Sequence, residues 1–151
     1  MKLSTKSEYG LRAMLNIAMN GSGATTSITD IAKDEGISVA YLEQLLNKLR
    51  RQGLLDSVRG PKGGYVLSKD TKDITVGDIV KTLEGSFYSA QCVAAGQGLR
   101  NACKKSKGCV PRLVWVKLAN TIGECLDSIT LKELCAESRK AGSGSDRWRL
   151  S

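Results

Sequence analysis

Apolar residues in the first part of the chain recur at the spacing of an α-helix, and glycines interrupt the pattern. In the first segment these residues are Leu11, Met14, Leu15 and Ala18. Thr5 and Glu8 precede the segment in the order of a capping box, in which each side chain accepts a hydrogen bond from the other residue's backbone N–H. We therefore predict an amphipathic helix that Thr5 caps and that ends before the glycines at positions 21 and 23.

The next two segments have the pattern of a helix-turn-helix. Ser27 is placed to cap a short helix, and Gly36 is placed to stop it. A third helix follows at once, with Ser38 as its predicted cap and Gln52 near its end. Its inward positions are all leucine, namely Leu42, Leu45, Leu46 and Leu49. Two helices joined by so short a turn predict a helix-turn-helix motif.

Two short strand-like runs follow directly, at residues 54–58 and 65–68, and the segment RGPKGG joins them. Its glycines and proline supply the backbone angles that a tight hairpin turn requires. A helix-turn-helix followed by a β-hairpin is the arrangement of a winged-helix protein. We therefore predict a mostly α fold with a small β-hairpin wing, in which residues 1–84 form a winged helix-turn-helix DNA-binding domain.

The remainder of the chain is predicted to contain three more helices. Thr75 caps one that runs to about residue 83, and Thr130 caps the last, over residues 131–138. Between them Pro111 opens a longer helix, whose apolar positions cover more than one face. Packing on the winged helix accounts for only one face, so we expect a dimerisation helix. The predicted units are a cysteine-bearing loop at 85–110, the dimerisation and C-terminal helices at 111–140, and a disordered tail at 141–151.

The formal net charge of the 151-residue chain is +8, from 23 Lys and Arg against 15 Asp and Glu. This balance favours a polyanionic partner, nucleic acid before a membrane surface, over a merely soluble basic protein. No apolar run is long enough to span a bilayer, and the N-terminus lacks the core of a signal peptide. We therefore expect a cytoplasmic protein with no membrane partner.

Polar and basic residues occupy the outward positions of the third helix and the tip of the wing. They are Ser38, Tyr41, Glu43, Gln44, Lys48, Arg50 and Arg51 on the helix, and Arg59, Gly60 and Lys62 in the wing. A charged helix face is commonly only solvated, but an arginine on a glycine-rich hairpin suits a narrow A·T-rich minor groove. We therefore expect a homodimer that binds double-stranded DNA at a near-palindromic operator with A·T-rich flanks.

Two residues of this surface are suited to base recognition. The Gln44 amide matches the edge of an adenine, and the Glu43 carboxylate can accept a hydrogen bond from a cytosine amino group. A carboxylate repels phosphate, so Glu43 would contribute to discrimination rather than to affinity. The alternative, that Glu43 is only a solvent-exposed helix former, remains open at this point.

Three cysteines, Cys92, Cys103 and Cys109, lie in the predicted loop beside several lysines, and the chain contains no histidine. Thiolates on a flexible loop suit an iron–sulfur cluster, and neighbouring lysines offset its charge. A zinc site and a thiol-redox switch, even one with no DNA role, are alternatives. Cys125 and Cys135 fall at apolar helix positions, where a core role is expected. Without histidine, a phosphate-binding loop or a paired-carboxylate site, we do not expect an enzyme.

Four runs of sequence carry a resemblance to a known family. They are AYLEQLLNKLR at 40–50, SVRGPKGGYVLSKD at 57–70, ITVGDIV at 74–80 and SITLKEL at 128–134. They resemble the IscR-like iron–sulfur cluster regulators of the Rrf2 winged-helix family. The resemblance implies a transcriptional regulator, repressor or activator, of iron–sulfur cluster assembly or stress genes, with the three loop cysteines as cluster ligands. It also implies an alternative, a clusterless regulator of cysteine metabolism.

The chain departs from these relatives in its ligand set. IscR-like proteins place a histidine three residues after the last cysteine, where this chain has Arg112, and they space the first two cysteines more closely. Some relatives use a carboxylate near the N-terminus, reached across the dimer, so we expect Glu8 as the fourth ligand, in competition with its predicted capping role. Three cysteines do not decide the cluster type, and we prefer 2Fe–2S to 4Fe–4S.

Overall fold

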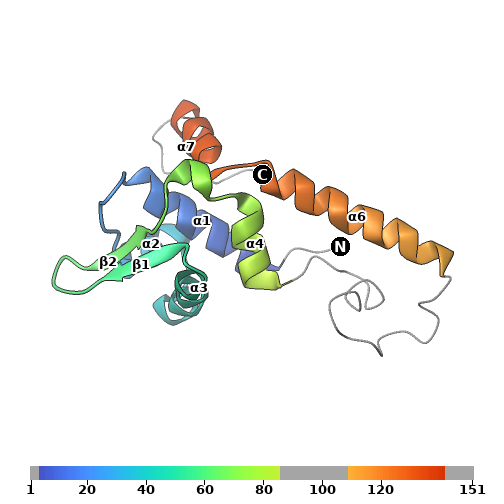
Figure 1. The fold of residues 1–151 in the computed structure, drawn as a ribbon. Helices are drawn as coiled ribbons and strands as arrows, with labels where there is room; N and C mark the ends of the chain where they lie inside the picture. The colour runs from blue at the N-terminus through green and yellow to red at the C-terminus, as the bar shows by residue number, and fades with distance from the viewer. Residues whose placement is uncertain (1–3, 86–108, 142–151) are drawn as a thin grey trace.

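The computed structural model describes residues 4–85 and 109–141, which form a winged helix with one projecting helix (Figure 1). In chain order the elements are α1 (Thr5–Met19), α2 (Ile28–Glu35), α3 (Val39–Arg51), β1 (Leu55–Val58), β2 (Gly64–Leu67), the 3-10 turn η1 (Thr71–Asp73), α4 (Val76–Glu84), α6 (Val110–Asp127) and α7 (Leu131–Lys140). The predicted fold class, mostly α with a small β-hairpin wing, is confirmed. The predicted tail and most of the predicted cysteine loop lie outside the described residues.

The hydrophobic core forms around α1, against which α2, α3, α4 and α7 pack (Figure 1). Its largest fully buried side chains are Met14, Ile17, Ile31, Leu42, Leu46, Leu49, Leu55, Ile74, Ile79 and Leu131. Each side chain of this kind contributes about 1.5–3 kcal/mol when it leaves water. Gly10 allows α4 to approach α1, because a Cβ at this position would overlap with the Leu83 side chain.

The start of α1 differs from the prediction. Ser4 rather than Thr5 is the cap, and its hydroxyl accepts a hydrogen bond from the Lys6 N–H at 3.2 Å. Glu84 at the end of α4 favours this start, because its carboxylate accepts hydrogen bonds from the Ser4 N–H at 3.1 Å and the Ser7 hydroxyl at 2.6 Å. The Ser4 hydroxyl also donates to this carboxylate. Burial alone would raise the pKa of Glu84, but the hydrogen bonds from Ser4 and Ser7 outweigh burial and lower it. The predicted capping box is therefore wrong.

The helix-turn-helix turn follows the prediction. Ser27 and Ser38 cap α2 and α3, and their hydroxyls accept hydrogen bonds from the N–H groups of Thr29 and Tyr41 at 3.2 Å. Gly36 ends α2 with a φ of 65°, a left-handed conformation that glycine adopts without steric cost. These local signals set where α2 ends and where α3 begins.

The wing is an antiparallel hairpin in which Val58 lies opposite Gly64. A backbone bridge attaches the hairpin to the domain, since Thr26 donates to the Tyr65 carbonyl at 3.0 Å and accepts from the Tyr65 N–H at 2.9 Å. Gly64 makes this approach possible, because a Cβ there would overlap with the Thr26 carbonyl group. The start of β2, next to the tip of the wing, is therefore fixed to the segment that precedes α2.

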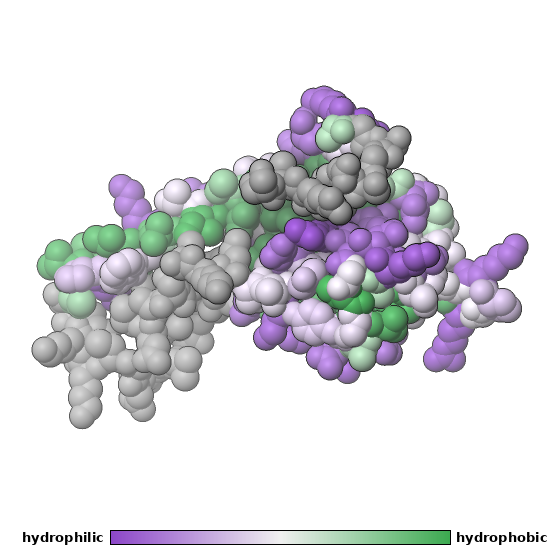
Figure 2. Space-filling model, turned by 180° about the vertical axis from the view of Figure 1, so that it is seen from behind, coloured by the Kyte–Doolittle hydropathy of each residue, from purple (hydrophilic) through white to green (hydrophobic). Residues whose placement is uncertain are grey.

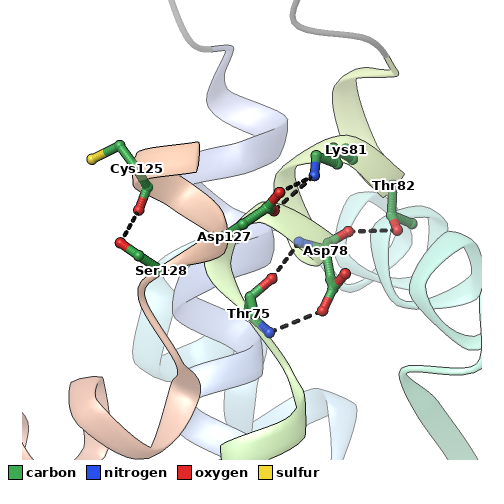
Figure 3. Close-up of polar contacts among 7 residues, drawn as sticks. All are labelled: Thr75, Asp78, Lys81, Thr82, Cys125, Asp127 and Ser128. Atoms are coloured by element: carbon green, nitrogen blue, oxygen red, sulfur yellow. Dashed lines mark hydrogen bonds and ion pairs between the residues drawn. The ribbon is translucent and has the colours of Figure 1, made fainter. Parts of the chain in front are cut away.

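Polar contacts join the C-terminal end of α6 to α4 (Figure 3). The Lys81 ammonium donates to both carboxylate oxygens of Asp127, at 2.7 and 2.6 Å. Thr75 and Asp78 form a capping box at the start of α4, with two hydrogen bonds of 3.0 Å. The first residue of α4 also donates its N–H to the Ile129 carbonyl at 2.8 Å. One end of α6 is therefore tied to the winged helix.

Away from this joint α6 projects from the domain, and Ala119 is its one buried residue (Figure 1). The exposed large apolar residues on it are Val110, Leu113, Val114, Trp115 and Leu118, with exposed fractions between 40% and 72%. Figure 2 shows a hydrophobic stripe along the projecting helix. As expected from the sequence, the winged helix leaves an apolar face of α6 uncovered. None of the described helices is long and apolar enough to cross a membrane.

Candidate nucleic-acid interface

The outward face of α3 is polar and basic. The four buried leucines lie on the opposite face of the helix and pack into the core. Its exposed polar residues include Glu43, Gln44, Lys48, Arg50 and Arg51, all of which were predicted to lie on this face. Within the described part of the chain, none of the three cations forms an ion pair. Their charges therefore remain available to an external polyanion.

Two other predicted residues of this surface are constrained by the fold. Ser38 is exposed, but its hydroxyl already caps α3 by accepting from the Tyr41 N–H. Tyr41 is half-buried, and its ring packs edge-on against Tyr9 with ring centres 6.2 Å apart. Tyr41 was predicted to lie on the outward face of the helix, whereas its side chain packs partly against the hydrophobic core. Tyr41 therefore anchors the start of α3 to α1.

The tip of the wing exposes Arg59, Gly60 and Lys62. Gly60 has a φ of 117°, which favours glycine, and its carbonyl accepts a hydrogen bond from the Gly63 N–H at 2.9 Å. The Thr25 hydroxyl donates to the Lys62 carbonyl at 2.9 Å. The backbone of the tip is thus held in place, while the side chains of the two cations extend into solvent.

Contacts between α3 and the wing make them one surface. Arg50 Nη1 donates to the Ser57 hydroxyl on β1 at 3.4 Å. Burial raises the pKa of Tyr65 on β2, the nearby Glu43 carboxylate raises it further, and the Arg50 charge opposes both. Arg50 and Glu43 on α3 therefore lie close to the paired residues Ser57 and Tyr65 of the wing. This proximity is tertiary information that the sequence pattern does not contain.

Sequence reasoning missed two apolar residues of this surface. Val39 and Ala40 at the start of α3 are both exposed, and neither was assigned to the interface. A signal for them existed, because helical spacing counted from the buried leucines places both positions outside the core face.

The three loop cysteines are only partly within the described structure. Cys109 is half-buried and occupies the cap position of α6, with no capping hydrogen bond from its side chain. Its side chain therefore has no role in capping α6. Cys92 and Cys103 lie outside the described residues.

Glu8 lies on the first turn of α1 and is exposed, with 56% of its side chain accessible. Its carboxylate accepts a hydrogen bond from Arg12 Nη2 at 2.8 Å. Because Ser4 caps the helix, the competition between capping and metal binding that the sequence suggested does not arise. An exposed pair of this kind contributes about 0.3–0.5 kcal/mol, so the carboxylate can exchange its partner at low cost.

The two helical cysteines differ from each other. Cys135 on α7 is buried and belongs to the core, and burial raises its pKa, as expected for a structural thiol. Cys125 on α6 is exposed, and its sulfur points away from the contacts between α4 and α6 (Figure 3). The predicted core role of Cys125 is wrong, because α6 projects from the domain and buries little of its surface.

Comparison with known proteins identifies the family. The family model described as "Rrf2: Iron-dependent Transcriptional regulator" matches residues 3–137. The chain belongs to the Rrf2 family. The HTH-type transcriptional regulator IscR of Escherichia coli O1:K1 is 37% identical to this Rrf2 protein over 134 residues, which are 89% of this chain and 80% of the relative.

Solved structures agree with this assignment. IscR of T. potens has a TM-score of 0.76 and 38% identity to this Rrf2 protein, covering 95% of this chain and 93% of that one. CymR, the global cysteine regulator of B. subtilis, has a TM-score of 0.75 and 35% identity, covering 91% and 98%. The resemblance inferred from the sequence is confirmed, and the chain is an IscR-like transcriptional regulator of the Rrf2 family. Its relatives are regulators rather than enzymes.

Proposed function

We propose that this Rrf2 protein binds operator DNA with α3 and the wing. One observation carries the proposal, namely that α3 and the wing both expose cations and are in contact with each other. Arg50 joins the two parts through Ser57, and Thr25 holds the tip that presents Arg59 and Lys62. An α-helix has the width of the major groove, and an arginine on a tight hairpin suits a narrow minor groove.

The side chains of this surface divide into two roles. Lys48, Arg50 and Arg51 at the C-terminal end of α3 suit phosphate contacts, which set affinity and orientation. Gln44 suits an adenine edge and Glu43 a cytosine amino group. The Glu43 carboxylate is exposed on α3 and lies close enough to Tyr65 of the wing to raise the pKa of that phenol.

The proposed DNA-binding form is a homodimer joined through α6. Five large apolar side chains are exposed along this helix, and a monomer would leave this stripe in water (Figure 2). A second copy of α6 can cover the stripe and relate two α3 helices by a twofold axis. The operator would then be near-palindromic, with A·T-rich flanks under the wings.

We propose further that Cys92, Cys103 and Cys109 hold an iron–sulfur cluster, with 2Fe–2S preferred to 4Fe–4S. Glu8, free of any capping role, is the proposed fourth ligand. Since Cys109 begins α6, which extends away from the domain, Glu8 would be supplied by the other copy of the dimer (Figure 1). When bound, the cluster would link its redox or iron state to the arrangement of the dimer and so to operator affinity. Expected targets are genes of iron–sulfur cluster assembly or stress response.

A second candidate is a clusterless regulator of cysteine metabolism in the cytoplasm. The similarity to CymR of B. subtilis favours it, since 91% of this chain matches that structure at 35% identity. The two candidates share the DNA-binding surface and differ in the role of the loop cysteines. A test of DNA binding therefore addresses both, and a metal analysis separates them.

The DNA-binding proposal is tested with Arg59→Ala and, as a control of equal charge, Lys132→Ala on α7. The probe is a duplex selected from random DNA by the unmodified protein, with A·T-rich or G·C-rich flanks. Arg59→Ala removes a charge-assisted contact worth about 1.5–3 kcal/mol. It should therefore bind the duplex with A·T-rich flanks roughly 10- to 100-fold more weakly, and the loss should be smaller with G·C-rich flanks. Lys132→Ala should bind almost normally. If the unmodified protein selects no sequence, the proposal is wrong.

A further inference from the structure

Outside α6, the exposed large apolar residues of the described chain are Val39 and Val58, with exposed fractions of 41% and 45%. Both belong to the elements that form the DNA-binding surface. Val39 is the first residue of α3, and Val58 is the last residue of β1 in the wing. An exposed valine offers no charge or hydrogen bond to phosphate, so the basic character of this surface does not account for either residue.

The position of Val39 points to the major groove. It follows the cap Ser38 directly, and the neighbouring Ala40 is also exposed. Residues at the N-terminal end of a recognition helix are those that reach base edges. One turn further along, Glu43 continues the same side of the helix. The end of α3 that would enter the groove first is therefore apolar, and its polar residues come later.

Nothing in the helix itself favours a valine at this place. A β-branched residue has a lower helix propensity than alanine, and 41% of Val39 remains exposed to solvent. The core face of α3 is already occupied by its four buried leucines. Val58, in contrast, lies in a strand, where β-branched residues are common for local reasons.

The major groove contains one apolar group on its base edges, the C5-methyl of thymine. We propose that Val39, supported by the Cβ of Ala40, is a specificity-determining residue that contacts a thymine C5-methyl in each operator half-site. This proposal rests on the proposed DNA-binding function and deepens it. It assigns one base type to the start of α3, beside the adenine and cytosine contacts of Gln44 and Glu43.

The test replaces thymine by deoxyuridine, one position at a time, in the duplex selected by the full-length protein. This change removes only the C5-methyl and keeps base pairing. Burial of one methyl group is worth about 0.8 kcal/mol, so the protein should bind about fourfold more weakly at the contacted thymine. In Val39→Ala the same replacement should change affinity by less than about 1.5-fold, since the partner methyls of the valine are absent.

Val58→Ala is the matched control, because it removes the same two methyl groups from a similarly exposed valine in the wing. The minor groove presents no thymine methyl, so Val58→Ala should keep the full deoxyuridine penalty. The proposal is overturned if the unmodified protein tolerates every thymine replacement, if Val39→Ala keeps the penalty, or if Val58→Ala removes it. The scan with unmodified protein decides this without relying on a variant. Failure of that protein to select any duplex would instead refute the DNA-binding function.

Discussion

Gly64→Ala should detach the wing while leaving the helices folded. Gly64 has ordinary extended backbone, but a Cβ there would overlap with the Thr26 carbonyl. The hairpin must move, and the two hydrogen bonds between Thr26 and Tyr65, at 3.0 and 2.9 Å, are lost or lengthened. At about 1 kcal/mol for each hydrogen bond, the free energy of unfolding should fall by about 2 kcal/mol. For a chain of about this length the melting temperature should fall by roughly 4–8 °C.

Gly21→Ala provides a control with a similar cost at another site. Gly21 has a φ of 95°, and no atom lies within 4 Å of the position that a Cβ would take, so alanine strains the backbone by about 1–2 kcal/mol without displacing a neighbour. Thermal unfolding followed by circular dichroism should show comparable losses for both variants. Fluorescence anisotropy with the selected duplex should show at least tenfold weaker binding for Gly64→Ala alone. Wild-type affinity of Gly64→Ala, or an equal loss in Gly21→Ala, would refute the role of the Thr26 bridge in placing the wing.

Three further predictions concern charged groups. The Glu35 side chain is 1% exposed, its Oε1 has no hydrogen-bond partner among the described residues, and Arg12 Nη1 lies 3.9 Å from its other oxygen. Burial raises the pKa of Glu35 above 4.5, although the charge of Arg12 opposes this shift. The protonated side chain therefore favours the folded state fully below pH 4.5, and this contribution is lost as the pH rises through the raised pKa. Glu35→Gln should therefore stabilise the protein by about 1 kcal/mol at pH 7, and the gain should vanish in melts below pH 4.5; a gain independent of pH would contradict this. Glu8→Ala removes an exposed ion pair with Arg12 that is worth about 0.3–0.5 kcal/mol, so the melting temperature should barely change. The visible spectrum of cluster-loaded protein should shift, and an unchanged spectrum would rule out Glu8 as a ligand. Lys81→Met should lower the free energy of unfolding by less than about 1 kcal/mol, and by less in high salt, because both members of its ion pair with Asp127 are 45% exposed. A larger loss of stability that does not depend on salt would mean that this pair holds α6 in place.

Most helix boundaries can be predicted because their signals are local. The caps at Ser27 and Ser38 and the stop at Gly36 depend on residues within one turn of each other. The start of α1 could not be predicted in this way. Ser4 is preferred to Thr5 because Glu84 binds it, and these two residues are separated by 80 positions.

The candidate site shows the same division. Exposure of Gln44 or Lys48 follows from helical spacing against the buried leucines, which the sequence displays. The packing of Tyr41 on Tyr9 and the approach of Glu43 to the wing depend on how separate elements meet, so the pattern of one helix cannot reveal them. Helical periodicity also predicted that Cys125 is buried. This prediction was wrong because the pattern of one helix does not show that α6 projects from the domain.

The most direct test of the proposed sensor is the visible absorption spectrum of anaerobically purified full-length protein, with iron and sulfide measured in the same sample. We expect brown protein with charge-transfer bands and matching iron and sulfide, and we expect both to be lost in Cys103→Ala. The Cys125→Ala variant is the control, since Cys125 is exposed on α6 and has no proposed ligand role. Colourless protein that carries stoichiometric zinc or no metal would contradict the cluster assignment and leave the clusterless regulator.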